Sequence, residues 1–280
     1  MAKSDYNRGR KPSKHSSKGP QKKQFARKPK SQDRPQRPAP KSNPDEIRLN
    51  RYIANAGICS RREADTYIAA GNVTVNGKVI TEMGFKVKRS DDVRFDGRKL
   101  SLEKKEYVLL NKPKNFITTT SDEKGRRTVM ELVSSASKAR LLPVGRLDRN
   151  TTGLLLFTND GDITKKLTHP KHGVRKIYQV TLDKNLALTD LRKIEAGLEL
   201  EDGTIEVDQV SYIQGQPKKE VGIEIHSGRN RIVRRIFEHL DYNVIKLDRV
   251  IFAGLTKKDL PRGHWRHLTE QEVINLRMIR

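Results

Sequence analysis

The sequence predicts an α+β protein: a small module of helices and a hairpin, followed by a larger domain with a largely antiparallel sheet flanked by helices. Three observations support this prediction. Residues 45–280 suffice for one small domain and one of ordinary size. Apolar residues recur with helical spacing in some segments and with strand spacing in others. The expected strands and helices do not alternate strictly, which argues against a doubly wound parallel sheet.

Residues 1–44 form a strongly basic tail in front of these domains. The tail carries 14 Lys or Arg and two acidic residues, which supplies +12 of the net charge of +24. It also contains seven of the twelve prolines and only two aromatic residues, too little apolar surface to offset the entropy of ordering. We expect a disordered tail that binds phosphate backbones without reading their sequence, and a polyanion as the partner of the chain.

The composition also excludes several classes of protein. The basic start is not followed by the apolar stretch of a signal peptide, and no apolar run approaches the length of a membrane span. We therefore expect a soluble cytoplasmic protein that does not contact membranes. Cys59 is the single cysteine, which excludes an intrachain disulfide and a zinc ribbon. Two histidine pairs, at 169/172 and 264/267, lack a third ligand nearby, so we predict no metal site.

The first folded segment is expected over residues 45–104. Apolar residues within 47–56 fall at i, i+3, i+4 and i+7, which predicts a short amphipathic helix. Ser60 is placed to cap a second helix, and Gly71 fits the position just after its C-terminus. Asn76-Gly77 then separates two short alternating runs, which predicts a hairpin.

The larger domain is expected over residues 105–280. Strands are predicted at 107–110, 154–157, 177–182, 204–213 and 221–225, and helices at 128–133, 162–167, 189–196 and 230–240. A capping box at 269–272 predicts a C-terminal helix.

Asp148 is the candidate for chemistry in this domain. It stands between Arg146 and Arg149, directly before an apolar run, and two permanent cations favour the ionised form of a carboxylate. An anion there can serve as a nucleophile or a base, although an ordinary structural ion pair would give the same pattern. The chain has no phosphate loop, no nucleophile-elbow serine and no dinucleotide fingerprint, so Asp148 remains by elimination. A second carboxylate pair, Asp160 and Asp162, is more typical of a turn and a helix N-cap than of glycosidase-like acid/base chemistry.

Four arginines lie within seven residues near the predicted start of the 230–240 helix: Arg229, Arg231, Arg234 and Arg235. Guanidinium groups at a helix start are suited to binding phosphate or carboxylate. A solvated basic helix face would explain the first two equally well. The last two lie beside apolar residues, so we expect at least one of them to point toward a partly enclosed site.

Residues 47–62 together with 71–77 resemble the alpha-L (S4-like) RNA-binding module, named after a small-subunit ribosomal protein. The resemblance covers about fifty residues and includes the Ser-Arg-Arg helix start. It implies that Arg51, Arg61 and Arg62 bind RNA, whereas a solvated helix face would need them only for solubility.

The larger domain resembles the RsuA/RluB branch of the RNA pseudouridine synthases. The similar motifs are residues 111–113, 145–148 with 152–155, 176–180 and 228–235, in the order and spacing of that branch. The resemblance implies the pseudouridine synthase fold and a cofactor-free isomerisation, in which the glycosidic bond of uridine breaks, the uracil turns and carbon five rejoins the ribose. Ser227 and Ile232 depart from the residues that many relatives carry there, which affects the detail of RNA binding more than the reaction class.

The same resemblance assigns roles to individual residues. Asp148 is then the catalytic aspartate, Tyr178 stacks on the target base, and Arg234 pairs with Asp148, although composition alone favours a core tyrosine at 178. The basic residues expected to contact RNA in this domain are Lys112, Arg146, Arg149, Arg229, Arg231 and Arg235. The expected substrate of a monomeric enzyme is large-subunit (23S) ribosomal RNA, in precursor or assembling form. The alternatives are a small-subunit rRNA pseudouridine synthase and a non-catalytic RNA-binding assembly factor.

Overall fold

The computed structural model describes residues 45–279, so the predicted tail of residues 1–44 lies outside the described residues. Within the described range, residues 46–99 and residues 107–278 are each built from their own helices and strands. None of the helices in this range is long and apolar enough to cross a membrane.

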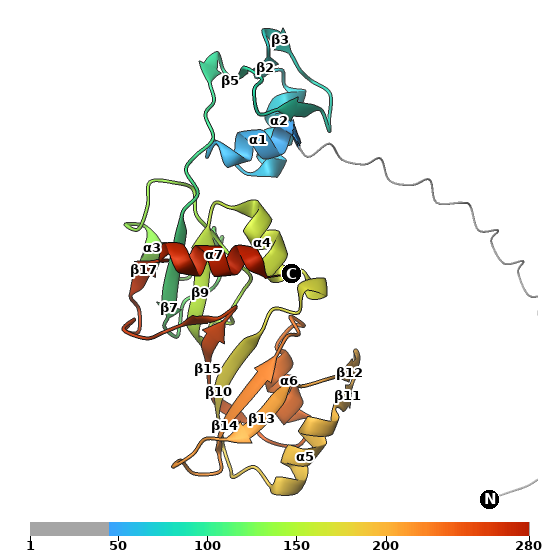
Figure 1. The fold of residues 1–280 in the computed structure, drawn as a ribbon, viewed down its shortest axis with the longest axis vertical. Coiled ribbons are helices and arrows are strands. Elements are labelled where there is room, and N and C mark those ends of the chain that lie inside the picture. Colours follow the sequence, from blue (N-terminus) through green and yellow to red (C-terminus); the bar gives the residue numbers. More distant parts are fainter. Residues whose placement is uncertain (1–44, 280) are drawn as a thin grey trace, which may run out of the picture. The chain divides into compact units, whose positions relative to one another are not determined.

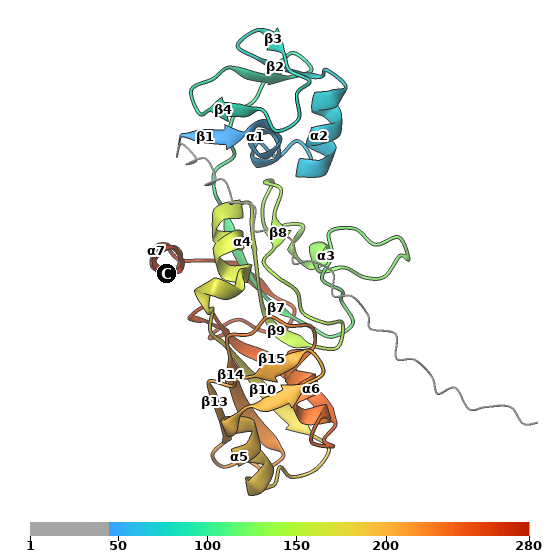
Figure 2. The same ribbon diagram turned by 90° about the vertical axis from the view of Figure 1, so that its right-hand side faces the viewer.

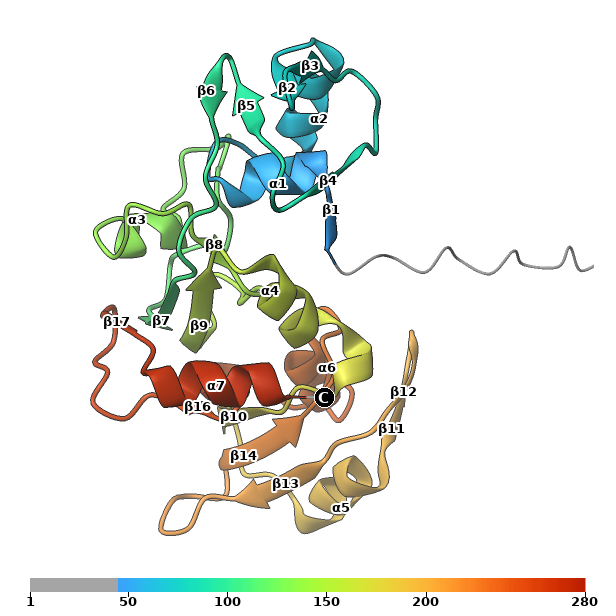
Figure 3. The ribbon, with the colours of Figure 1, turned by 45° about the horizontal axis from the view of Figure 1, so that its top comes forward.

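The first of these two parts contains a pair of packed helices, α1 (Leu49–Asn55) and α2 (Arg61–Ala69) (Figure 3). Helix α2 begins with a capping box: the Ser60 hydroxyl accepts from the Glu63 amide, and the Glu63 carboxylate accepts from the Ser60 amide. The predicted apolar stripe of α1 lies in the core of this part. Both helices therefore form where the apolar spacing and the cap predict them.

The strands of this part surround the predicted Asn76-Gly77 turn. Both turn residues have positive φ, which suits a tight hairpin between neighbouring strands. The strands are β1 (Glu46–Arg48), β2 (Val73–Val75), β3 (Lys78–Val79), β4 (Lys86–Lys88), β5 (Val93–Phe95) and β6 (Arg98–Lys99). Their sheet orders are β3-β2-β5-β6 and β1-β4.

The second part is organised around a mixed sheet in the order β13-β14-β10-β15-β9-β7-β17 (Figure 1). Its strands are β7 (Tyr107–Lys112), β9 (Thr152–Thr158), β10 (Lys176–Leu182), β13 (Gln209–Tyr212), β14 (Glu220–Ile225), β15 (Val244–Phe252) and β17 (Trp265–His267), with β8 (Leu142–Pro143) and β16 (Leu255–Thr256) at its margins. Strands β9 and β15 run parallel, and the other pairs along this order are antiparallel. The predicted largely antiparallel sheet is confirmed.

Helices cover both faces of this sheet (Figure 2). They are α3 (Val129–Val133), α4 (Gly161–Thr168), α5 (Leu188–Ala196), α6 (Ile232–Glu238) and α7 (Glu270–Met278). Successive residues of a strand point to opposite faces, so Leu155 of β9 packs in the core with α3, α5 and α6, whereas Leu154 packs with α4 and α7. The near-continuous apolar run of β9 reflects burial on both of its faces.

Gly153 allows β9 to approach β15 closely. A Cβ at this position would overlap the backbone of Arg249, and the φ of Gly153 is +105°, where L side chains are strained. The loop of residues 144–151, which contains Asp148, leads directly into this contact. The glycine therefore fixes where that loop meets the sheet.

Two predicted boundaries are wrong. The single strand expected over 204–213 is divided into β12 (Gly203–Ile205), which pairs with β11 (Leu198–Leu200), and β13, which pairs with β14. Apolar alternation does not show that two halves of a segment join different partners. The helix expected from residue 230 begins only at Ile232, because Arg231 has a φ of +48°, outside the helical region.

Candidate active site

A cavity of about 480 Å³ lies where the 144–151 loop, the first residues of β10, the 226–231 loop and β15 meet. The volume is within the range of roughly 300–1,000 Å³ that is typical of small-molecule sites. Six of the predicted site residues line it: Arg146, Asp148, Arg149, Tyr178, Arg229 and Arg231. The structure thus brings together motifs that lie about 80 positions apart in the chain.

Asp148 forms an ion pair with Arg231 across this cavity. Its Oδ2 atom lies 3.8 Å from Nη1 of Arg231, and the two side chains are 39% and 46% exposed. An exposed pair of this length contributes little to stability, about 0–1 kcal/mol. The carboxylate is therefore accessible to a ligand, and the Arg231 guanidinium, which also pairs with Glu238 at 3.3 Å, stands opposite it.

Arg146 and Arg149 were expected to keep Asp148 ionised. Both are exposed and line the cavity, but the ion pair of Asp148 within the described residues is made by Arg231 instead. Side chains two residues before and one residue after a loop aspartate need not point toward it. Their contact with RNA remains a prediction.

Lys112 was expected to contact RNA, and the structure contradicts this. The residue is fully buried at the end of β7, and its ammonium donates to the carbonyl oxygens of Asp148 (3.0 Å) and Thr151 (2.8 Å). Two further carbonyls, of Pro113 and Arg149, lie at 3.1 and 3.4 Å. Burial lowers the pKa of Lys112 to about 8, against the opposing effect of the Asp148 charge. Lys112 therefore holds the backbone of the Asp148 loop instead of contacting a ligand.

Arg234 was expected to pair with Asp148, and the structure places Arg231 there. Arg234 is buried on α6, and its Nη1 donates to the carbonyl of Val244 at 2.8 Å. Burial lowers the pKa of Arg234, the Arg231 charge lowers it further, and the Asp148 charge opposes both. The Arg234 charge is therefore felt by Asp148, but its hydrogen bond anchors α6 to the start of β15.

Tyr178 lies on β10 and faces the cavity from its sheet side. It is 8% exposed, so its ring is largely covered by the surrounding core. Arg249 is its cross-strand partner on β15, and both line the cavity. Stacking of Tyr178 on a base remains a prediction.

Two of the clustered arginines are held by an acidic turn. Arg235 forms a bidentate pair with Asp202, at 2.9 and 2.6 Å, and Arg229 lies 3.6 Å from the same carboxylate. Asp202 is in the turn between β11 and β12, and Arg229 also donates to the carbonyl of Gly203. These contacts stabilise the loop before α6, and they occupy cations that were predicted to bind RNA.

The three arginines predicted to bind RNA through the small module lie on its helices. Arg61 and Arg62 are exposed in the first turn of α2, and Arg51 is half-buried on α1. Their contact with RNA remains a prediction.

The Asp160 and Asp162 pair has a structural role. Asp160 is the N-cap of α4: its Oδ1 accepts from the amide of Asp162 at 3.1 Å, and its Oδ2 accepts from the Tyr107 hydroxyl at 2.8 Å. The predicted turn and N-cap are confirmed.

Sequence reasoning missed two cations in the cavity, Lys176 and Arg249. Lys176 begins β10, and its ammonium donates to the carbonyls of Val174 (2.9 Å) and His226 (2.7 Å). Arg249 lies in β15, a strand that was not predicted. Lys176 stands two residues before Tyr178 on the same strand, so the strand alternation could have placed it in the site. The position of Arg249 depends on the pairing of β10 with β15, which the sequence does not show.

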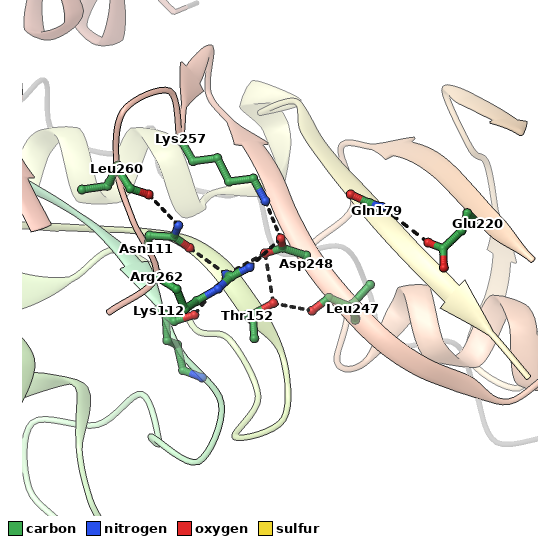
Figure 4. A network of polar contacts seen from close by, with 10 residues as sticks. All are labelled: Asn111, Lys112, Thr152, Gln179, Glu220, Leu247, Asp248, Lys257, Leu260 and Arg262. Atoms are coloured by element: carbon green, nitrogen blue, oxygen red, sulfur yellow. Dashed lines mark hydrogen bonds and ion pairs between the residues drawn. The ribbon is translucent and has the colours of Figure 1, made fainter. Parts of the chain in front are cut away.

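A polar network on the other face of the sheet ties together β7, β9 and β15 (Figure 4). Asp248 accepts two hydrogen bonds from Arg262, at 3.0 and 2.8 Å, one from Thr152 at 3.0 Å, and one from Lys257. Arg262 also donates to Asn111 at 2.7 Å. The network fixes the strands on which the Asp148 loop is mounted.

Comparison with known proteins defines the family. Residues 106–239 match the family described as RNA pseudouridylate synthase, and residues 47–93 match the S4 domain. The ribosomal large subunit pseudouridine synthase B of Bacillus subtilis (strain 168) is 42% identical over 235 residues, which cover 83% of this chain and 96% of that relative. The chain belongs to the RNA pseudouridine synthase family.

Further similarities confirm the predicted family and fold. The dual-specificity RNA pseudouridine synthase RluF of Escherichia coli (strain K12) is 37% identical over 82% of this pseudouridine synthase and 78% of its own length. A crystal structure of a pseudouridylate synthase superposes with a TM-score of 0.58 and 28% identity, covering 82% of this chain and 99% of that one. Among residues 45–279, no group of three or more His, Cys, Asp or Glu residues is placed to bind a metal ion.

Proposed function

We propose that this pseudouridine synthase converts a uridine of large-subunit ribosomal RNA into pseudouridine, with Asp148 as the catalytic carboxylate and without a cofactor. The Bacillus subtilis relative is named for the large ribosomal subunit, which supports this substrate over small-subunit RNA. The observation that carries the role of Asp148 is its position: a half-exposed carboxylate in a cavity that also holds Tyr178 and Arg231.

The cavity can hold a base that has left its stack. A uridine within a folded RNA is hidden, so the enzyme has to extrude it or act on a loop. Tyr178 lines the sheet side of the cavity, and stacking of the base on the part of its ring that faces the cavity offsets part of the extrusion cost. Asp148 then acts at the ribose, with the Arg231 guanidinium 3.8 Å from its carboxylate.

We assign RNA binding to residues 45–104 and catalysis to residues 105–280. The exposed Arg61 and Arg62 contact RNA backbone in the first part, and Arg146 and Arg149 do so at the rim of the cavity. We expect a cytoplasmic monomer whose substrate is precursor or assembling ribosomal RNA.

Tritium release from RNA labelled at carbon five of uridine tests this function. Transcripts of large-subunit and small-subunit ribosomal RNA are offered separately to the purified chain. The proposal expects release from the large-subunit transcript and a pseudouridine at one mapped position. Release only from the small-subunit transcript would mean that the substrate is small-subunit ribosomal RNA. Tight binding without release would favour a non-catalytic assembly factor.

A further inference from the structure

One buried and one half-buried cation line the sheet side of the cavity, and the proposed reaction assigns no task to them. Lys176 is on β10 and Arg249 on β15, two hydrogen-bonded neighbours in the sheet. Arg249 is directly opposite Tyr178 in the strand register. Side chains opposite each other in an antiparallel pair share a face of the sheet. A base stacked on Tyr178 therefore lies within reach of the Arg249 guanidinium.

Arg249 has an unused hydrogen-bond donor. The residue is 4% exposed, and its Nε donates to the carbonyl of Leu154 at 2.8 Å. The guanidinium carbon lies 4.4 Å from the centroid of the Phe252 ring, which fixes the plane of the group. Nη2 is buried and has no hydrogen-bond partner within the described residues. Buried donors are nearly always satisfied in folded proteins, so an unsatisfied one beside a cavity points to a ligand acceptor.

Neither cation has a carboxylate partner within ion-pair distance among residues 45–279. The Lys176 ammonium is saturated by backbone carbonyls and contributes charge without a free donor. Burial and the nearby Arg249 charge together lower the pKa of Lys176 to about 8, against the opposing effect of the Asp208 charge. The sheet side of the cavity is therefore electropositive and suited to a ligand that becomes anionic.

Resting on the proposed function, we infer that Arg249 is a further catalytic residue that donates from Nη2 to a carbonyl oxygen of the target uracil and stabilises the negative charge of the detached base. When the bond between C1′ and N1 breaks, its electron pair stays on the uracil and spreads over N1 and the ring oxygens. Asp148 meets the electron deficiency at C1′, either by bonding to it or by removing the neighbouring C2′ proton. A positioned cation at the ring oxygen is worth most at this moment, when the charge develops.

The second half of the reaction returns the enzyme's side chains to their starting state. The uracil turns, C5 bonds to C1′, and Asp148 regains its carboxylate by leaving C1′ or by returning the C2′ proton. The C5 proton then departs and N1 gains one, so the product is an isomer of the substrate and no oxidant or further reactant is needed. The Arg249 guanidinium holds the anion while it turns, because Nη2 can donate to whichever ring oxygen faces it.

Arg249→Gln tests the inference, with Lys246→Gln, an exposed cation on the same strand, as the matched control. The expected result for Arg249→Gln is a fall in kcat of about 100-fold with unchanged RNA binding. Lys246→Gln should retain the wild-type kcat. Far-UV circular dichroism and the thermal midpoint show whether each variant is folded. Arg249→Lys, which keeps a buried charge without the fork, should give a kcat between the wild type and the Gln variant and serves if the Gln variant does not fold.

A 5-fluorouridine substrate separates the chemical role from a structural one. Fluorine at C5 makes the departing uracil a weaker base, so less stabilisation by Arg249 is needed. Cleavage of the C1′–N1 bond, followed by chromatography of the digested RNA, should therefore show a defect at least several-fold smaller than with uridine. An equal defect with both substrates, or wild-type kcat in a folded Arg249→Gln variant, overturns the inference. An inactive wild-type enzyme would instead overturn the proposed function, so the two failures are distinguishable.

Discussion

The ammonium of Lys112 lies 3.0 Å from the carbonyl oxygen of Asp148. The loop that carries the candidate catalytic carboxylate is therefore held through its backbone by a fully buried cation. The same ammonium lies 2.8 Å from the carbonyl of Thr151, the last residue before β9. A short loop with several carbonyls turned inward needs such a donor, because buried backbone groups without a partner are costly. Lys112 thus links the backbone of the Asp148 loop to the sheet.

Lys112→Met should destabilise the protein and lower its activity together. The substitution keeps the length of the side chain but leaves at least two buried carbonyls without a donor, at about 1–3 kcal/mol each. We expect the free energy of unfolding in urea to fall by about 3 kcal/mol. Lys114→Met, at an exposed position two residues later, should change it by less than about 0.5 kcal/mol. Equal effects of the two substitutions would contradict the role of Lys112.

Substitution of Arg231 should lower mainly kcat, and substitution of Arg234 should lower mainly the stability of the fold. Arg231→Gln removes the cation 3.8 Å from Asp148 at an exposed position, so we expect kcat to fall at least about tenfold with little loss of stability. Arg234→Gln removes the hydrogen bond to the Val244 carbonyl, so we expect the free energy of unfolding to fall by about 2 kcal/mol. Steady-state kinetics and urea unfolding on both variants check this. A stable Arg234→Gln variant with the larger kcat defect would restore Arg234 as the partner of Asp148.

Asp202→Asn should strengthen RNA binding. The Asp202 carboxylate occupies Arg229 and Arg235 and competes with phosphate for them. Releasing both arginines should steepen the slope of log K against log salt by up to about 0.9 for each new phosphate contact. Glu201→Gln removes the same charge one residue earlier, where no ion pair is seen in the described chain, and it should leave the slope nearly unchanged. Fluorescence anisotropy at several salt concentrations measures both, and identical slopes for the two variants would mean that Asp202 only stabilises the loop.

Asp248 should contribute stability that disappears in acid. Burial raises the pKa of Asp248, but hydrogen bonds from Arg262 and Lys257 outweigh it and bring the value to about 2. Because the folded-state pKa is below the unfolded value of about 3.9, the contribution is complete above that pH and is lost as the pH falls toward 2. We expect Asp248→Asn to be about 2 kcal/mol less stable than wild type at pH 7, and the difference to shrink between pH 4 and pH 2. A difference that stays constant over this range would show that the ion pairs do not carry it.

Much of the fold was predictable because local signals agreed with the final structure. The capping box at Ser60 and the Asn76-Gly77 turn specify their elements through contacts within a few residues. Strand β15 was missed because Lys246, Asp248 and Arg249 interrupt its apolar pattern. Asp248 is half-buried and pairs with Arg262, which follows later in the chain, and no local pattern reveals such a partner.

The candidate site was predictable to the level of motifs but not of individual contacts. The sequence singles out the Asp148 loop and the arginine cluster by their charged residues, and residues of both line the cavity. Which arginine faces Asp148 depends on the left-handed backbone at Arg231, which ends the loop and turns Arg234 inward. The burial of Lys112 was equally hidden, because a lysine beside a proline at a strand end is more often exposed.

The most direct test of the role of Asp148 is tritium release by Asp148→Asn under single-turnover conditions, with labelled large-subunit ribosomal RNA and enzyme in excess. Asparagine keeps the size of the side chain and removes its charge, and because Asp148 is half-exposed the variant should fold and bind RNA as the wild type does. We predict wild-type RNA affinity and no release above background. Release at the wild-type rate would contradict the assignment of Asp148 as the catalytic carboxylate.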